Sequence, residues 1–254
     1  MKILISNDDG IGAPGIVALE EIARQISDDV YVVAPGSNMS GAGHSLTLKT
    51  PLRLEIHGAK HFSVSGTPTD SVVMAIRHIM EKKPDIMLSG INFDTNLAED
   101  ITYSGTVAAA MEARLLGIPA IAFSQEMFHD GTVNWEISKK YGLDIIKIIL
   151  EKYSFPKEIL LNVNFPAVKD ISEIKGFRIT RQGFRAGEDH VIKSVDPRGV
   201  PYFWIGSADY RKTDTTKELD TDLGAVNHNY ISITPVSLNF TADYAIQSLK
   251  EIFS

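Results

Sequence analysis

Short apolar runs alternate along this chain with stretches in which apolar residues recur every three or four positions. Residues 3–6 and 30–34 are apolar runs of strand length, and turn-forming residues follow each of them, Asn7-Asp8-Asp9-Gly10 and Pro35-Gly36. Between the two runs, apolar residues at positions 16, 19, 22, 23 and 26 have helical spacing. The pattern predicts a buried strand, a helix and a second buried strand at the start of the chain.

The same alternation continues to residue 164. Helical spacing predicts helices that begin near residue 69, near residue 104 and at residue 134, and apolar runs predict strands at residues 85–88, 120–123 and 160–164. Strands that alternate with helices are typical of the α/β class. We therefore expect a three-layer α/β/α, Rossmann-like fold with a doubly wound, mainly parallel sheet.

The pattern changes after Phe165-Pro166. Residues 177–181 and 202–205 are predicted strands separated by turns rich in glycine and charge, which indicates a C-terminal β-hairpin or arm. A polar segment at residues 211–222 leads to an alternating strand at 230–235 and a last helix from about 241 to 252. We expect a single domain, residues 1–254, in which residues 1–166 form the α/β catalytic core. The C-terminal extension, residues 167–254, carries the arm, the last strand and the last helix.

Composition narrows the class of protein. The chain has 254 residues, 44% of them hydrophobic and 22% charged, as in ordinary soluble proteins. Its net charge of −7 argues against a binder of nucleic acid polymers, and the absence of cysteine excludes disulfides and thiolate metal ligands. The N-terminus lacks the apolar core of a signal peptide, and no apolar run approaches the ~20 residues needed to span a bilayer. These features predict a protein without membrane segments and with a cytoplasmic location.

Two adjacent carboxylates, Asp8 and Asp9, follow the first predicted strand. Open parallel sheets bind ligands beyond the carboxyl ends of their strands, where neighbouring carboxylates would repel each other. A hard divalent cation relieves this repulsion, because such cations prefer oxygen ligands. The alternative is a solvated turn, since Asn-Asp-Asp-Gly is also favourable turn chemistry.

Neutral oxygen ligands follow two other strands of the predicted sheet. Ser40 lies in the loop after the second strand and Asn92 in the loop after the third. Loops at the same edge of a parallel sheet lie close together, so Asp8, Asp9, Ser40 and Asn92 are expected to converge. We expect them to hold one divalent cation per subunit, Mg²⁺ or Mn²⁺. Capping or ordinary loop hydrogen bonds are the alternative roles of Ser40 and Asn92.

A helix start near this edge is a candidate anion site. Ser104 has the position of an N-cap, and Gly105 and Thr106 would expose their N–H groups in the first turn. A plain serine cap is the alternative. A cation site and an anion-binding helix start at one sheet edge together indicate phosphate-ester chemistry.

One motif favours a different ligand. Gly10, Gly12 and Gly15 match the dinucleotide-binding fingerprint between a strand and a helix. A cofactor pyrophosphate would then lie beside Asp8 and Asp9, whose charges oppose it. A nicotinamide-binding oxidoreductase therefore stays as an alternative, with weak support.

With these motifs in order, the chain resembles the SurE (survival protein E) family over essentially its whole length. The matching segments are Asn7-Asp8-Asp9-Gly10, Val33-Ala34-Pro35 with Ser40-Gly41, Ser65-Gly66-Thr67-Pro68-Thr69-Asp70, Ser89-Gly90-Ile91-Asn92, Tyr103-Ser104-Gly105-Thr106-Val107 and Ser232-Ile233-Thr234-Pro235. The resemblance implies a metal-dependent phosphomonoesterase, a 5'-nucleotidase that hydrolyses nucleoside 5'- and 3'-monophosphates. Some members of the family also shorten polyphosphate.

The resemblance also implies roles for individual residues. The metal ligands would be Asp8, Asp9, Ser40 and Asn92, and the substrate contacts Gly41, Asn96, Ser104, Gly105 and Thr106. Asp8, Asp9, Asn96 and Ser104 would be the catalytic residues, and the sequence leaves open whether an aspartate acts as base or as nucleophile. The family's C-terminal arm is exchanged between subunits, which implies a homodimer or homotetramer in which residues 185–222 form the arm.

The chain departs from the family pattern at Asp94, where the family usually has glycine. Aspartate tolerates left-handed backbone better than most residues, so we expect the turn to survive. A carboxylate here would oppose a dianionic substrate. A non-catalytic nucleotide-binding protein is therefore a further alternative.

Overall fold

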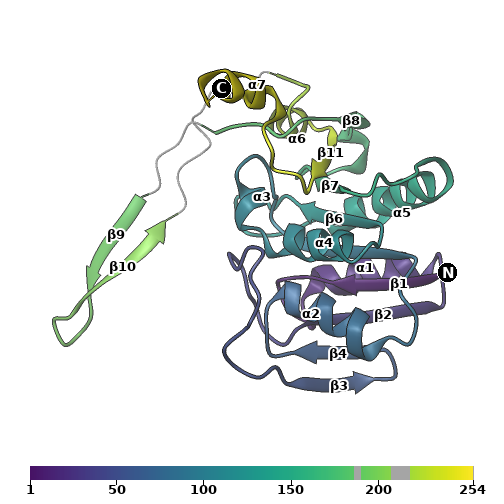
Figure 1. Ribbon diagram of the computed structural model, residues 1–254. Helices are drawn as coiled ribbons and strands as arrows, with labels where there is room; N and C mark the ends of the chain where they lie inside the picture. Colours follow the sequence, from purple (N-terminus) through teal and green to yellow (C-terminus); the bar gives the residue numbers. More distant parts are fainter. Residues whose placement is uncertain (186–189, 207–217, 254) are drawn as a thin grey trace.

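The computed structural model describes residues 1–185, 190–206 and 218–253, and a nine-stranded sheet forms its centre (Figure 1). In order across the sheet, the strands are β3 (Leu54–Gly58), β4 (His61–Val64), β2 (Asp29–Pro35), β1 (Lys2–Ser6), β5 (Ile86–Phe93), β6 (Ala120–Gln125), β7 (Ile159–Phe165), β11 (Ile231–Ser237) and β8 (Phe177–Ile179). The six strands from β4 to β7 are parallel to their neighbours, whereas β3 and β11 pair antiparallel with β4 and β7.

The direction of winding reverses between β1 and β5. The chain passes from β1 through β2 to β4 on one side, and then returns to place β5, β6 and β7 on the other. In doubly wound sheets a ligand crevice forms at this switch point, beyond the carboxyl ends of the two strands. Ser6 ends β1 and pairs with Ser89 of β5, so the segments that follow them leave the sheet side by side.

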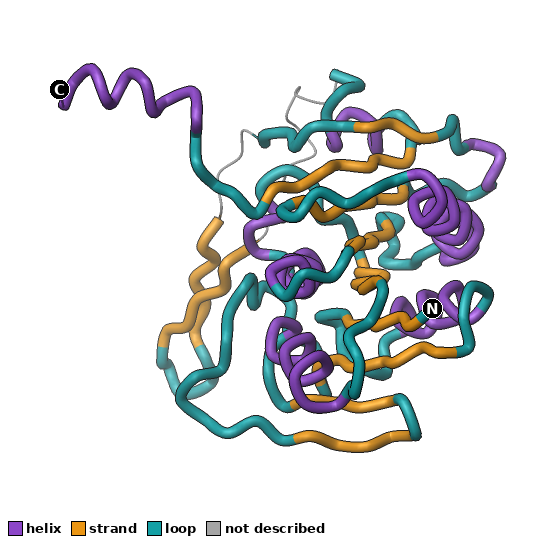
Figure 2. Tube along the Cα trace, turned by 45° about the vertical axis from the view of Figure 1, so that its right-hand side comes forward, coloured by secondary structure: helices purple, strands orange, loops and turns teal. Residues whose placement is uncertain are grey.

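Helices cover both faces of the sheet (Figures 1 and 2). The described helices are α1 (Pro14–Arg24), α2 (Pro68–Met74) with a π-turn (Ala75–Ile79), α3 (Asp100–Tyr103), α4 (Gly105–Leu115), α5 (Trp135–Lys152), a 3₁₀ turn (Ile171–Glu173), α6 (Asp222–Asn227) and α7 (Asp243–Phe253). The last of them, α7, has no buried residue and projects away from the sheet (Figure 2). Alternate residues of a strand point to opposite faces. Accordingly, Ile3 and Ile5 pack with α1 and α5, whereas Leu4 packs with α2 and α4.

These elements confirm the predicted α/β class and the mainly parallel sheet. The predicted strands and helices of the first 165 residues all form, with ends that differ by a few residues. The largest difference is β5, which extends to Phe93 and therefore carries Asn92 within the strand. The single-domain division at residue 166 stays a prediction.

The predicted C-terminal β-hairpin is confirmed, but residues 177–181 are not one of its strands. Residues 177–179 form β8, which pairs in parallel with β11 at the edge of the main sheet. The hairpin consists instead of β9 (His190–Val195) and β10 (Pro201–Gly206), which pair antiparallel. A local pattern marks each strand but carries no information about its partner, so β8 was matched to the wrong one.

Part of the predicted arm, residues 185–222, lies outside the described residues, namely 186–189 and 207–217, and the second range includes residues 211–217 of the polar segment. Within the described ranges, no helix has both the length and the apolarity required to cross a membrane.

Candidate active site

The turn after β1 fixes the two aspartates at the switch point. Asn7 is fully buried, and its side chain donates to the Gly10 carbonyl at 2.9 Å and accepts the Gly10 N–H at 3.2 Å. Gly10 has a φ of +102°, a conformation that favours glycine. The segment is therefore a tight turn, as its composition indicated. The turn is not solvated around Asp8, however, because this side chain is only 4% exposed.

Asp8 lies against the first turn of α4. Its carboxylate accepts a hydrogen bond from the hydroxyl of Thr106. Burial raises the pKa of Asp8, although hydrogen bonds from the Thr106 hydroxyl and from the N–H groups of Thr106 and Gly105 act to lower it. A Cβ atom on Gly105 would lie 2.7 Å from the Cβ of Asp8. Glycine at the first position of α4 is what lets the helix start approach the carboxylate so closely.

Asp9 is held by β5. Its Oδ2 accepts the backbone N–H of Phe93 at 3.1 Å. Burial first, and the negative charge of Asp8 second, raise the pKa of Asp9 to about 6. Both aspartates thus carry raised pKa values, mainly because each carboxylate is buried away from water.

Asn92 brings an amide oxygen to the same place. Its Nδ2 donates to the carbonyl of Asp94 at 2.8 Å, and its Oδ1 lies 3.3 Å from the hydroxyl of Thr106. Asp8 and Asn92 therefore meet at one hydroxyl group. The structure brings together Asp8, Asp9 and Asn92, as the sequence predicted.

The Ser40 loop is attached to this cluster through its backbone. The N–H of Met39 donates to the carbonyl of Asp8 at 2.8 Å, and the N–H of Ser40 to Oδ1 of Asn38 at 2.7 Å. The side chain of Ser40 is exposed, and in the described structure its hydroxyl makes no hydrogen bond with the aspartates. Gly41 follows in an open, left-handed conformation with a φ of +77°. The roles of Ser40 as ligand and Gly41 as substrate contact stay predictions.

The donor set suits a hard cation. Carboxylate and amide oxygens are the ligands that Mg²⁺ and Mn²⁺ accept, and both ions retain several waters. A cation among Asp8, Asp9 and Asn92 would offset the cost of burying the two carboxylates, and also the repulsion by Asp8 that helps to raise the pKa of Asp9. No group of three or more His, Cys, Asp or Glu side chains that could hold a metal occurs among the described residues. The site would therefore depend on neutral oxygens and water for the rest of its shell.

The start of α4 carries the predicted cap. Ser104 is the N-cap, as predicted, and its Oγ accepts the N–H of Val107 at 3.0 Å. The hydroxyl of Thr106 is engaged with Asp8 and is fully buried. Thr106 therefore positions the carboxylate through its side chain, a role that the sequence did not reveal. Contacts of Ser104, Gly105 and Thr106 with phosphate stay predictions.

Asn96 lies in a network of buried polar side chains that the sequence analysis missed. Its Nδ2 donates to Oγ of Ser124 at 2.8 Å, while its carbonyl accepts from Nδ2 of Asn162 at 2.8 Å and from Nδ2 of Asn164 at 3.3 Å. The signal was present, because Asn162 and Asn164 alternate with apolar residues and so share one face of β7. One Nδ2 hydrogen of Asn96 is left for a ligand, as its predicted phosphate contact requires.

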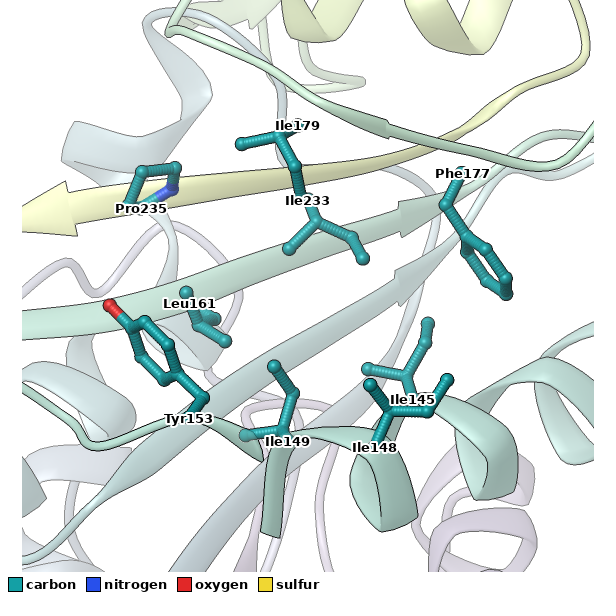
Figure 3. A pocket seen from close by; sticks show the side chains of 9 residues that line it. All are labelled: Ile145, Ile148, Ile149, Tyr153, Leu161, Phe177, Ile179, Ile233 and Pro235. Carbon is teal, nitrogen blue, oxygen red and sulfur yellow. The ribbon is translucent and has the colours of Figure 1, made fainter. Parts of the chain in front are cut away.

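A cavity with an almost wholly apolar lining lies elsewhere. It measures about 400 Å³ and opens between α5 and the strands β7, β8 and β11 (Figure 3). Its lining is Ile145, Ile148, Ile149, Tyr153, Leu161, Phe177, Ile179, Ile233 and Pro235. It offers one hydroxyl group and no carboxylate, amide or histidine side chain, so phosphate-ester chemistry has no groups to act with there.

Fold and site together define a class: a doubly wound α/β protein whose switch point gathers oxygen ligands beside a helix start. The family model of survival protein SurE matches residues 3–189, and the chain belongs to the SurE family. It is 48% identical over 254 residues to the 5'-nucleotidase SurE of Paramagnetospirillum magneticum, covering 100% of this chain and 96% of the relative. It is also 48% identical to the 5'-nucleotidase SurE of Rhodopseudomonas palustris strain BisB18, with 98% of each covered. The solved structure of the SurE protein from Aquifex aeolicus superposes with a TM-score of 0.85 at 43% identity, over the whole of both chains.

The structure does not favour the alternative of a nicotinamide-binding oxidoreductase. A Cβ atom on Gly15 would lie 1.8 Å from the carbonyl oxygen of Ile91, so this glycine is required for the packing of α1 on β5. Two carboxylates of raised pKa stand where a pyrophosphate would lie. The fingerprint match is thus explained by turn and packing geometry.

Proposed function

We propose that this chain is a metal-dependent 5'-nucleotidase, which hydrolyses nucleoside monophosphates to nucleoside and inorganic phosphate. The observation that carries the proposal is the meeting of Asp8 and Asn92 at the Thr106 hydroxyl, on the first turn of α4 at the switch point of the sheet. The full-length similarity to proteins named 5'-nucleotidase SurE supports the same reaction. Activity on 3'-monophosphates and on polyphosphate is a further part of the proposal.

Asp8, Asp9, Asn92 and Ser40 would hold one Mg²⁺ or Mn²⁺ per subunit. When bound, this ion supplies positive charge at the phosphoryl oxygens and polarises the attacking water. The protein's own part is positioning, which dominates catalysis of phosphoryl transfer. The free Nδ2 hydrogen of Asn96 would orient the phosphoryl group, with Ser104 fixing the helix start. The N–H groups of Gly105 and Thr106 bond to the carboxylate of Asp8, so they would contact the phosphoryl group only by sharing these bonds with it.

The two aspartates differ in how readily their carboxylates could accept a proton from water. Asp8 is buried against donors of α4, which fix its carboxylate in place. Asp9 accepts a hydrogen bond from Phe93 and is less deeply buried, so it is the better candidate to take the proton of the attacking water. The new P–O bond forms as the bond to the ribose oxygen breaks. The ribose oxygen takes up a proton from solvent, Asp9 gives its proton back to solvent, and the nucleoside leaves.

Phosphate release is the direct test. Purified protein is incubated with AMP, GMP, CMP and UMP in Mg²⁺ or Mn²⁺, with EDTA-treated protein beside it. We expect release that EDTA abolishes and either cation restores, and Asp8→Asn should remove most of it while the circular dichroism spectrum is unchanged. Undiminished turnover by Asp8→Asn would show that the site lies elsewhere. Nucleotide binding without release would favour the non-catalytic alternative.

The arm supports a homodimer or homotetramer. The strands β9 and β10 form a separate two-stranded sheet that stands away from the main sheet (Figure 1). Isolated hairpins are marginally stable, and this one exposes Ile192, Phe203, Trp204 and Ile205. Exposed apolar patches mark interfaces. Light scattering should give a mass of two or four subunits, reduced by Trp204→Asp, and fractionation should place the protein in the cytoplasm.

A further inference from the structure

A cavity of about 470 Å³ adjoins the candidate active site on the side of α1. Asp9 lines it, so it is continuous with the carboxylates that face the switch point. Its wall is the turn from Gly10 to Gly15 together with residues 36–38, and two aromatic side chains, Phe93 and Trp135, complete it. The volume falls in the range of ordinary ligand pockets.

The charges of this cavity exclude an anion. Asp9 is the only charged residue in its lining, and no lysine or arginine balances it. Asp9 would repel a phosphate group placed in this cavity. It would not repel a neutral group, even when that group is attached to a phosphate bound beside Asp8. The neutral part of a nucleoside monophosphate is the nucleoside.

The shape of the lining suits a flat ring. Phe93 ends β5 and is 43% exposed, although its backbone N–H is fixed on Asp9. Trp135 begins α5, and its ring lies 3.2 Å from where a Cβ on Gly15 would stand. Gly12 has open space within 4 Å of its missing Cβ. Glycine backbone and two aromatic side chains therefore line one cavity, called the slot below, and bases can stack on aromatic side chains.

Polar groups lie at the rim of the slot. Asn38 uses its Oδ1 to accept the N–H of Ser40, which directs its Nδ2 donor to the other side. The hydroxyl of Ser37 is also part of the lining. Both can bond to the edge of a base.

We infer that this cavity is the base-binding subsite of the enzyme, with Phe93 and Trp135 as its stacking residues and Gly12 as the residue that keeps it open. The inference rests on the proposed function. A second cavity of about 440 Å³, on the far side of Ser104, is the competing location. It includes one aromatic side chain, Phe240, which is 83% exposed, and neither aspartate of the candidate site.

The kinetic test compares two substrates that share the sugar phosphate and differ in the base, AMP and ribose 5-phosphate. The ratio of their kcat/KM values measures what the base contributes. Stacking on an aromatic residue corresponds to about 5- to 150-fold in affinity, so the wild type should prefer AMP by a factor in this range. Gly12→Leu, which fills the slot, and Phe93→Leu, which keeps the backbone bond to Asp9, should each lower the ratio at least about fivefold. Phe93→Trp should restore it.

The matched control places the same leucine in the competing cavity. Thr102 is exposed and lines that cavity, so Thr102→Leu should leave the ratio unchanged. If Thr102→Leu lowers the ratio and Gly12→Leu does not, the base lies beside Ser104 and the inference is overturned.

A binding measurement separates this inference from the proposed reaction. The chain has two tryptophans, so in Trp204→Phe the fluorescence reports Trp135 alone. Adenosine, added without metal, should quench this signal saturably, and Gly12→Leu should weaken the binding at least about fivefold. Phosphate release from AMP without quenching, and with the ratio unchanged in every variant, overturns the subsite alone. Quenching without phosphate release overturns the proposed function alone.

Discussion

The side-chain amide of Asn164 pairs with the backbone of Asn96 in both directions. Its Oδ1 accepts the Asn96 N–H at 2.8 Å, and its Nδ2 donates to the Asn96 carbonyl at 3.3 Å. Through these two hydrogen bonds, β7 fixes the loop that follows β5, much as one strand of a sheet fixes its neighbour. The loop needs such support, because Asp94 and Ala98 on either side of Asn96 have positive φ angles of 83° and 50°.

Removal of the Asn164 amide should displace Asn96. We expect Asn164→Ala to lower kcat/KM for AMP by between about ten- and a hundredfold, because small misplacements of a substrate contact have effects of this size. The variant leaves buried polar groups of Asn96 without partners, so the free energy of unfolding should also fall by about 1–3 kcal/mol. Phosphate release and urea unfolding measure the two effects.

A double-mutant cycle distinguishes positioning from general weakening. If Asn164 acts through Asn96, then Asn164→Ala should have little further effect on kcat/KM in an Asn96→Ala background. Leu161→Val, on the opposite face of β7, is the control that weakens packing without contact to Asn96. Additive losses in the cycle would contradict the positioning role.

The close approach of α4 to Asp8 gives a second prediction. Gly105→Ala places a methyl group 2.7 Å from the Cβ of Asp8 and 2.9 Å from its Oδ2, so the carboxylate must move. We expect at least about a tenfold loss of phosphate release and weaker Mn²⁺ binding by calorimetry. Gly58→Ala, whose nearest neighbour lies 3.7 Å away in His61, is the control and should change neither. Normal activity in Gly105→Ala would show that Asp8 tolerates displacement.

The sequence was sufficient for the local parts of this architecture. The turn from Asn7 to Gly10, the cap at Ser104 and the alternation of strands and helices all follow from short-range chemistry. The switch point between β1 and β5 follows from the order of the elements, which is why the carboxylates and Asn92 could be placed together.

The sequence does not reveal which side chains bond to partners far away along the chain. Thr106 donates to Asp8 across 98 positions, and Asp222 accepts the N–H of Ala98 across 124. Locally, Thr106 is only a threonine in the first turn of a helix, and Asp222 is only an aspartate at the start of a helix. Neither position indicates the distant partner of its side chain. The partner of β8 was missed for the same reason, since any edge strand offers the same backbone groups.

Asp94 gives a prediction about substrate charge. It adopts the left-handed conformation with a φ of 83°, and its Oδ1 accepts the N–H of Thr95 at 2.8 Å, so the turn survives without glycine. Asp94 lies two residues after Asn92, and its carboxylate is bound to Thr95, just before Asn96, so its charge would oppose a dianionic substrate held by these residues. Asp94→Asn keeps an acceptor and removes the charge, so we expect KM for AMP to fall about two- to tenfold with kcat unchanged. Asp144→Asn, on α5, controls for net charge. A KM that is equal in all three proteins would show that Asp94 exerts no field on the substrate.

The raised pKa of Asp9 predicts how the metal-free protein responds to pH. Because burial and the charge of Asp8 raise this pKa to about 6, above the ordinary value of 3.8, the folded state binds a proton more tightly than the unfolded state does. The free energy of unfolding should therefore increase as the pH falls from 7 towards 5, and this gain should be complete below the ordinary value. Asp8, whose pKa burial also raises, acts in the same direction.

Urea unfolding in EDTA at pH 5, 6 and 7 measures this dependence, and Asp9→Asn isolates it from other titrating groups. The variant should be more stable than the wild type at pH 7 and should approach it at pH 5. Added Mn²⁺ should reverse the wild-type trend, because the cation competes with the proton for the same oxygens and stabilises the fold most at pH 7. Parallel pH profiles of the metal-free wild type and Asp9→Asn would show that the two carboxylates do not strain the empty site.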